Sequence, residues 1–182
     1  MARWAAFMAV LVFSFPLAAP NAQSGEDEID YEKIFKQSLS RGGKYLKLGG
    51  KKIGDRGVKI LASHEMMRKV TRLDLRYNAI TAVGAKYLAE SQLLKGLQVL
   101  VLRHNFIGDE GTKAVAESAV FSNLVELQLG WNEIHDPGGM ALARSKTLVK
   151  LKKLDLRGNF LADSTKETLK QAFKHLPKLR FF

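Results

Sequence analysis

Residues 97–107 read LQVLVLRHNFI, and the same pattern returns 27 residues later as LVELQLGWNEI over residues 124–134. Both segments place leucine at the first, fourth and sixth positions, asparagine at the ninth and isoleucine at the eleventh. Four of the six asparagines in the chain lie on this grid: Asn78, Asn105, Asn132 and Asn159. A fixed period of this length predicts a solenoid of stacked coils rather than a compact globule.

The same grid divides most of the chain into repeat units. The predicted units are a degenerate first repeat at 44–69, clear repeats at 70–96, 97–123, 124–150 and 151–175, and a terminal strand at 176–182. Lys51 stands where the first repeat should have asparagine, so we expect its turn to be looser or exposed. Residues 23–43 hold an acidic segment and a short helix, whose apolar face comprises Tyr31, Ile34, Phe35 and Leu39. Atypical end units of this kind cover the open hydrophobic ends of a solenoid.

Each unit contains signals for a strand, a turn and a helix. Leu73 and Leu75 alternate with polar neighbours, which predicts a short strand with its leucines inward. The asparagine that follows can satisfy backbone groups of the turn and stack with its counterpart in the next repeat. Aspartates recur at one position of the repeat, where we expect helix N-caps, and Thr81 takes their place in one repeat. Glycines recur at a second position, where a side chain would crowd the neighbouring coil. These columns are Asp55, Asp109, Asp136 and Asp163, and Gly57, Gly84, Gly111 and Gly138.

A strand, a turn and a helix within 27 residues resemble the ribonuclease-inhibitor-like class of leucine-rich repeats. The resemblance covers roughly residues 44–182. It implies an α/β fold: a right-handed, horseshoe-shaped leucine-rich-repeat solenoid with a parallel sheet on the concave side and helices on the convex side. The turns Ile53–Gly57 and Ile107–Gly111, of the form I-G-D-x-G, also resemble those of the Ran GTPase-activator family.

The first 22 residues have the layout of a secretory signal peptide. Arg3 is followed by an apolar run from Trp4 to Leu17 and then by small residues as far as Ala22. We expect residues 1–22 to be removed by cleavage after Ala22, and the mature chain to be secreted or periplasmic with no membrane span. The alternative is a retained anchor, but the run is shorter than the roughly 20 residues of a spanning helix and Pro16 interrupts it.

The composition narrows the chemistry and the kind of partner. The chain has no cysteine, which excludes disulfides, thiolate metal sites, cysteine nucleophiles and a lipid anchor on cysteine. Its net charge of +11 is uneven: residues 26–32 carry five acidic and no basic side chains, whereas residues 33–182 carry 28 lysines and arginines against 13 aspartates and glutamates. Such a field favours another protein with an acidic surface, or an anionic glycan or nucleic acid. A solvated basic exterior with no ligand is the other interpretation.

The side chains that point outward from the strands are the candidates for binding a partner. On the predicted concave face these are Arg72, Asp74, Arg76, Tyr77, Arg103, His104, Glu126, Gln128, Trp131, Lys153, Asp155 and Arg157. Arg76, Tyr77, Arg103, His104 and Trp131 should be neighbours, because adjacent strands lie about 4.8 Å apart. Arginine, tyrosine and tryptophan are the residue types most enriched in binding hot spots. Trp131 either contacts a partner or packs on Arg103 or Arg157 in an internal cation–π contact.

No segment has a pattern typical of catalysis, a cofactor or a metal site. Residues 49–55, GGKKIGD, resemble a phosphate-binding loop but lack the Lys-Ser/Thr pair. The four histidines lack ligand spacing, no serine lies in a nucleophile elbow, and Asp74 and Asp155 are three repeats apart. We therefore expect a monomeric, non-catalytic protein-interaction module without cofactor or metal. The alternatives are a binder of anionic glycan or nucleic acid and, in third place, a GTPase-activating protein.

Overall fold

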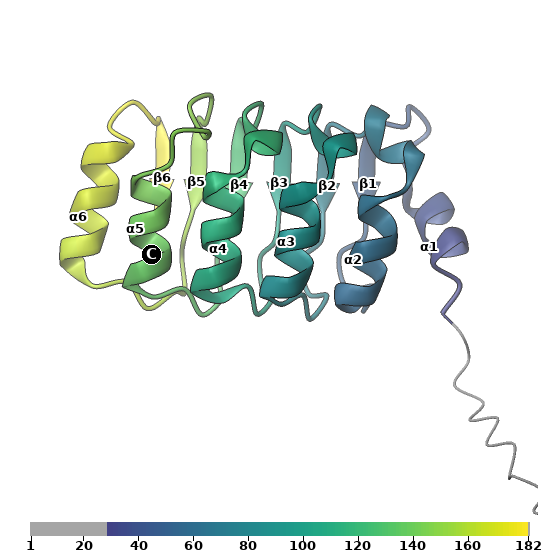
Figure 1. Cartoon of the computed structure of the whole chain (residues 1–182), viewed down its shortest axis with the longest axis horizontal. Coiled ribbons are helices and arrows are strands. Elements are labelled where there is room, and N and C mark those ends of the chain that lie inside the picture. Colours follow the sequence, from purple (N-terminus) through teal and green to yellow (C-terminus); the bar gives the residue numbers. More distant parts are fainter. Residues whose placement is uncertain (1–28, 182) are drawn as a thin grey trace, which may run out of the picture.

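The computed structural model describes residues 29–181, and the expected signal peptide lies outside them. A row of helices covers one side of a six-stranded sheet (Figure 1). The strands are Tyr45–Lys47 (β1), Arg72–Asp74 (β2), Val99–Val101 (β3), Glu126–Gln128 (β4), Lys153–Asp155 (β5) and Lys178–Arg180 (β6). The α-helices are Tyr31–Ser38 (α1), Gly54–Ala62 (α2), Ala82–Glu90 (α3), Gly108–Glu117 (α4), Asp136–Ala143 (α5) and Asp163–Ala172 (α6). Three 3-10 helices, Glu65–Lys69 (η1), Gln92–Leu94 (η2) and Ala119–Phe121 (η3), follow α2, α3 and α4.

The sheet is parallel and its strands follow one another in chain order from β1 to β6. Its register aligns one leucine from every strand: Leu46, Leu73, Leu100, Leu127, Leu154 and Leu179. This is the column that the 27-residue spacing predicts, except that in the terminal strand Leu179 pairs with Leu154 only 25 residues earlier, so β6 arrives two residues early. The predicted α/β leucine-rich-repeat solenoid is confirmed.

The inward side chains of successive coils form one continuous hydrophobic core. Leu73 and Leu75 are fully buried, and so are Leu100 and Leu102 in the next coil. Each buried leucine contributes about 1.5–3 kcal/mol relative to an exposed one, so the repeated columns provide most of the stability. The sheet thereby presents only its alternate, outward residues to solvent, on the side away from the helices.

A ladder of asparagines joins each coil to the next. Asn105 Oδ1 accepts hydrogen bonds from the backbone N–H groups of Asn78 (2.9 Å) and Ile80 (3.1 Å) in the preceding coil. Its Nδ2 donates to the carbonyl oxygens of Leu75 (3.0 Å) and Leu102 (2.8 Å). The amide therefore satisfies groups of two repeats at once, as the sequence predicts. Lys51, which cannot do this, is exposed.

The aspartate column caps helices, but not the helices in which it lies, and in this respect the sequence-based prediction is wrong. Asp55 Oδ1 accepts hydrogen bonds from the N–H groups of Thr81 (2.9 Å) and Gly84 (3.0 Å), at the start of α3 in the next coil. Asp109 Oδ1 does the same for His135 (2.8 Å) and Gly138 (3.0 Å) at the start of α5. Each aspartate lies in the first turn of its own helix, so its carboxylate reaches sideways to the free N–H groups of the neighbour.

The glycine column allows these helices to pack closely. A Cβ at Gly111 would lie 2.7 Å from Ile107 Cγ2 and 3.0 Å from the Ala82 Cα in the preceding coil. A Cβ at Gly138 would lie 3.1 Å from the Asp109 Cα. The predicted crowding is confirmed.

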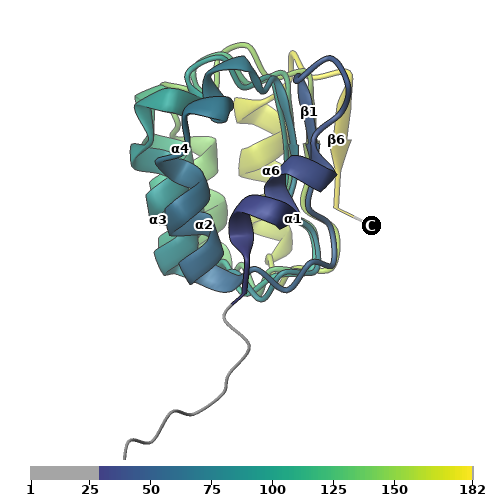
Figure 2. The same cartoon turned by 90° about the vertical axis from the view of Figure 1, so that its right-hand side faces the viewer.

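Helix α1 covers the first coil of the solenoid. Figure 2 shows it across the N-terminal end, between the helix row and the sheet. Asp30 caps it by accepting a hydrogen bond from the Lys33 N–H (2.9 Å), and Phe35 is completely buried in the core. Among residues 29–181, no helix combines the length and the hydropathy needed to cross a membrane.

Candidate functional site

We define the sheet face as two sets of side chains. The first set points outward from β1 to β6. The second set belongs to the residue that follows the second inward leucine of each repeat, as Arg76 follows Leu75. Two of the predicted binding residues on the sheet face are not accessible: Asp74 is 4% exposed and Asp155 1% exposed. Arg76 lies two residues after Asp74 on the same face and folds back over it, with Nε and Nη2 3.0 and 2.8 Å from Oδ2. Arg157 covers Asp155 in the same way, with Nε 2.9 Å from Oδ1 and Nη2 2.6 Å from Oδ2. The expectation that these two carboxylates face solvent is therefore wrong, because each is shielded by an arginine of its own repeat.

The pair with Arg157 favours the ionised form of the buried Asp155 carboxylate. Burial acts to raise the pKa of Asp155, but hydrogen bonds from the Arg157 side chain and N–H, with the charges of Arg157 and Arg103, bring that pKa below its ordinary value. The two pairs present guanidinium groups rather than carboxylates to a partner.

Glu126, Gln128 and Lys153 form a second polar group near the C-terminal half of the sheet face. Lys153 Nζ lies 2.6 Å from Glu126 Oε1, which also accepts a hydrogen bond from Gln128. Burial acts to raise the pKa of Glu126, yet these two hydrogen bonds and the nearby positive charges lower it overall. Arg72 is one of these charges, and its Cζ lies 5.1 Å from the centre of the Tyr45 ring.

Three rings form a continuous stack at the turn that follows β2, β3 and β4. The Tyr77 and His104 rings lie 4.3 Å apart at 10°, and the His104 and Trp131 rings lie 4.6 Å apart at 11°. The sequence predicts that these residues are neighbours, and the structure brings them together. Burial, and then the charge of Arg103, lower the pKa of His104, which favours the neutral form of its ring.

The backbone of this stack is strained. Tyr77, His104 and Trp131 have φ values of 55°, 54° and 56°, in the left-handed region. Such a conformation costs an L-residue about 1–2 kcal/mol, and the corresponding positions in the flanking repeats, Gly50 and Gly158, are glycines. The chain thus places bulky rings where its neighbouring repeats use glycine, and it leaves Tyr77 55% exposed and Trp131 39% exposed.

Trp131 makes the predicted internal cation–π contacts and is nevertheless partly exposed. The Cζ atoms of Arg103 and Arg157 lie 4.9 and 5.6 Å from its ring, which makes the internal cation–π contacts. More than a third of its surface nevertheless faces solvent. The contacts therefore orient the ring without covering it.

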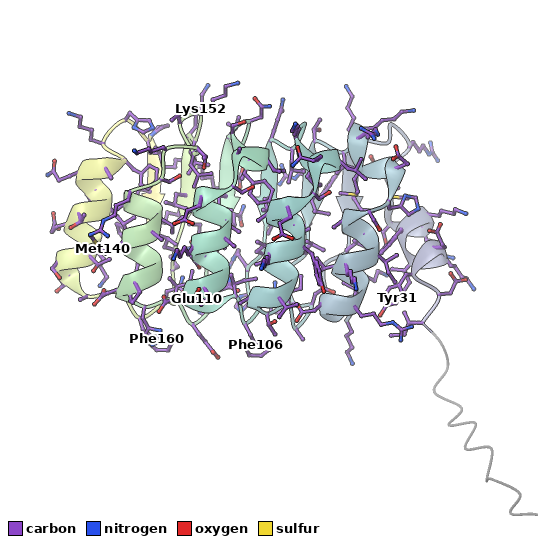
Figure 3. All side chains as sticks on the ribbon, in the orientation of Figure 1. Tyr31, Phe106, Glu110, Met140, Lys152 and Phe160 are labelled. Atoms are coloured by element: carbon purple, nitrogen blue, oxygen red, sulfur yellow. The ribbon has the colours of Figure 1, made fainter. Side chains whose placement is uncertain are left out.

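Sequence reasoning missed two further aromatic residues, Phe106 and Phe160. They are 55% and 63% exposed, and they line a hollow of about 370 Å³ together with the stacked rings and Glu133. Figure 3 shows both side chains projecting from the same edge of the solenoid. Both directly follow a ladder asparagine, at a position that the repeat leaves free to face outward, and this spacing could have revealed them. We call the set of Tyr77, His104, Phe106, Trp131 and Phe160 the aromatic edge.

The comparisons with known proteins agree with this architecture. The family model described as Leucine Rich repeat matches residues 67–89, 97–116 and 122–143. The chain is a leucine-rich-repeat protein. In its fold, this leucine-rich-repeat protein resembles a solved Caenorhabditis elegans structure described as the tropomodulin C-terminal domain, with a TM-score of 0.61 and 16% identity over 80% of this chain and 92% of that one. No curated protein matches the sequence significantly.

The remaining motifs of the leucine-rich-repeat protein have structural explanations. Asp55 and Asp109 of the I-G-D-x-G turns are occupied in capping the next helix. The glycine-rich segment at residues 49–55 connects β1 to α2 as the turn of the first repeat. Within residues 29–181, no three histidines or carboxylates come together in a group that could hold a metal ion.

Proposed function

We propose that this leucine-rich-repeat protein is a non-catalytic interaction module that binds a protein partner through the sheet face and the aromatic edge. One observation carries the proposal: rings of Tyr77, His104 and Trp131 stand stacked and partly exposed at backbone positions that favour glycine. A rigid aromatic surface of this kind provides contact area at little further cost in side-chain entropy.

The charges around the aromatic edge support an acidic partner. Arg76 and Arg157 present guanidinium groups over their buried aspartates, and Arg103 lies between them in the same row. Aromatic residues beside arginines are the composition typical of the centre of a protein interface. The basic repeat body would add long-range attraction and increase the rate of association.

The test is affinity capture with a double variant. The protein is used as bait in an extract of its native host, and proteins retained by it are identified by mass spectrometry. We expect Trp131→Ala combined with Arg103→Ala to lose a specific partner while the circular dichroism spectrum is unchanged. The matched control is Val83→Ala combined with Lys113→Ala on the helix side, where both residues are exposed, and it should retain the partner. A partner that still binds the first variant would show that the binding surface lies elsewhere.

The excess of positive charge supports a second candidate, binding of an anionic glycan or nucleic acid by the repeat body. This function predicts affinity for heparin or DNA that falls steeply with salt, because counterions are released when phosphates or sulfates are neutralised. Affinity that hardly changes between low and physiological salt would count against it.

We further propose that residues 1–22 direct export and are then removed. The polar segment that follows Ala22, and the short apolar run before it, support this proposal. N-terminal sequencing of the protein recovered from the medium or periplasm should begin at Gln23, and a chain that retains Met1 would contradict it.

A further inference from the structure

An aspartate paired with the arginine two residues later recurs on the sheet face, and we call this pair the fork. In one repeat the fork lacks its aspartate. In the second and fifth repeats, an aspartate at the last strand position forms an ion pair with the arginine two residues later. These pairs are Asp74 with Arg76 and Asp155 with Arg157. The third repeat has an arginine at the same place, Arg103, but the strand position before it is Val101. The repeat thus retains the guanidinium and lacks the carboxylate.

Within residues 29–181, no other group takes the place of that carboxylate beside Arg103. Its Nε is shielded from solvent and has no hydrogen-bond partner, and no carboxylate lies within ion-pair distance of its guanidinium. The charge of Arg103 helps to lower the pKa of Asp155, but Asp155 already accepts three hydrogen bonds from Arg157. A shielded donor without a partner is costly, and most such donors in folded proteins are satisfied. Arg103 as a whole is partly exposed.

In the part of the chain that the structure describes, the groups around the Arg103 guanidinium are small or apolar, and none of them accepts a hydrogen bond from its Nε. Gly130 follows Arg103 in the row of the sheet face, and a Cβ added there would lie 3.8 Å from Arg103 Nε but only 3.1 Å from the Arg157 carbonyl oxygen, so the next coil packs closely beside Nε and shields it. Val99 and Val101 make the adjacent part of β3 apolar, and Trp131 lies against the guanidinium, with the Arg103 Cζ 4.9 Å from the ring centre. Apolar walls of this kind strengthen an ion pair because they exclude water.

We propose that Arg103 is the receptor for an aspartate or glutamate side chain of the protein partner, which completes in the third repeat the fork that Asp74 and Asp155 complete in theirs. The partner's carboxylate engages the terminal nitrogens, a turn of the guanidinium brings Nε into a side-on pair, and the apolar part of the same residue packs on Val101 and Trp131. This inference rests on the proposed function, because it assigns the chemistry recognised at that surface.

The variant Val101→Asp tests this assignment without removing Arg103. It installs the missing carboxylate at a position where Asp74 and Asp155 are accommodated in the same conformation, so the fold should be retained. The internal aspartate would then occupy Arg103 and close the site. Val99→Asp is the matched control, because it adds the same charge to the same strand two residues farther from Arg103.

The probe is a phage-displayed library of random peptides, selected on the immobilised full-length protein. We expect the selected peptides to share an aspartate or glutamate at one position, and to bind Val101→Asp about 10- to 100-fold more weakly than wild type, since one charge-assisted pair is lost. Val99→Asp should weaken the same peptides by less than about threefold, the effect of charge at the rim of an interface.

Three outcomes would overturn the assignment. Selected peptides without a shared acidic position, or with equal affinity for wild type and Val101→Asp, would show that Arg103 does not receive a carboxylate. If those same peptides lose affinity for Trp131→Ala, the proposed interaction surface still stands, whereas unchanged binding to Trp131→Ala would remove that surface as well. Selection of no peptide, with heparin binding that Val101→Asp abolishes, would assign Arg103 to a sulfated glycan instead.

Discussion

Replacing Asn105 by alanine should test how strongly the asparagine ladder holds the coils together. The side chain makes four hydrogen bonds of 2.8–3.1 Å to backbone groups of two adjacent repeats, and it is 3% exposed. At about 1 kcal/mol for each bond, the variant should lose about 4 kcal/mol of unfolding free energy. That is a large fraction of the 5–15 kcal/mol typical of a folded domain.

The assay is urea denaturation followed by circular dichroism at 222 nm. With a slope of about 2 kcal/mol per molar urea, the midpoint should fall by about 2 M. Asn123→Ala is the matched control, because Asn123 lies off the repeat grid and its hydrogen bonds, to the Lys95 carbonyl and from Lys150, are at the surface. The Asn123→Ala variant should lose less than about 1 kcal/mol of unfolding free energy. Equal midpoints for the two variants would refute the role given to the ladder.

Three further changes have directions fixed by the structure. Gly111→Ala should lower the melting temperature by an amount equivalent to about 1–3 kcal/mol, because the new Cβ would lie 3.0 Å from the Ala82 backbone. Gly42→Ala is the control and should leave the melting temperature unchanged, because a Cβ at Gly42 meets nothing within 4 Å. Asp109→Ala should cost about 1 kcal/mol in urea denaturation, through the lost cap of α5, and an unchanged midpoint would show that water replaces the carboxylate. The lowered pKa of Asp155 means that its pair with Arg157 stabilises the fold fully above pH 4 or so, the range of a free carboxyl, and that this contribution disappears as the pH falls through the folded value. Asp155→Asn should therefore flatten the stability curve on the acid side, and Asp163→Asn, at a carboxylate 95% exposed, should not.

The repeat period made the fold predictable. The leucine columns, the asparagine ladder and the close-packing glycines each follow from one residue type at a fixed spacing, and the strand register repeats that spacing. The early arrival of β6 could also be read from the position of Leu179.

The contacts that the sequence did not reveal depend on the direction in which a side chain turns, toward the next coil or back along its own strand. Asp55 and Asp109 were placed in the correct turn, but their carboxylates reach the next helix and not their own. Asp74 and Asp155 were placed on the correct side of the strand, but an arginine two residues later covers each one. A linear pattern gives the face on which a side chain lies, and it does not give the rotamer that decides what the side chain contacts.

The most direct test of the account uses Trp131 as a reporter. The chain has two tryptophans, Trp4 and Trp131, so Trp131 is the single tryptophan once residues 1–22 are removed, or in the full-length Trp4→Phe variant. A saturating amount of the partner recovered by affinity capture should shift its emission to shorter wavelength and reduce its quenching by acrylamide, because the partner removes the ring from water. A partner that binds at full stoichiometry and leaves both the emission and the quenching unchanged would contradict the claim that this edge is where the protein makes its contact.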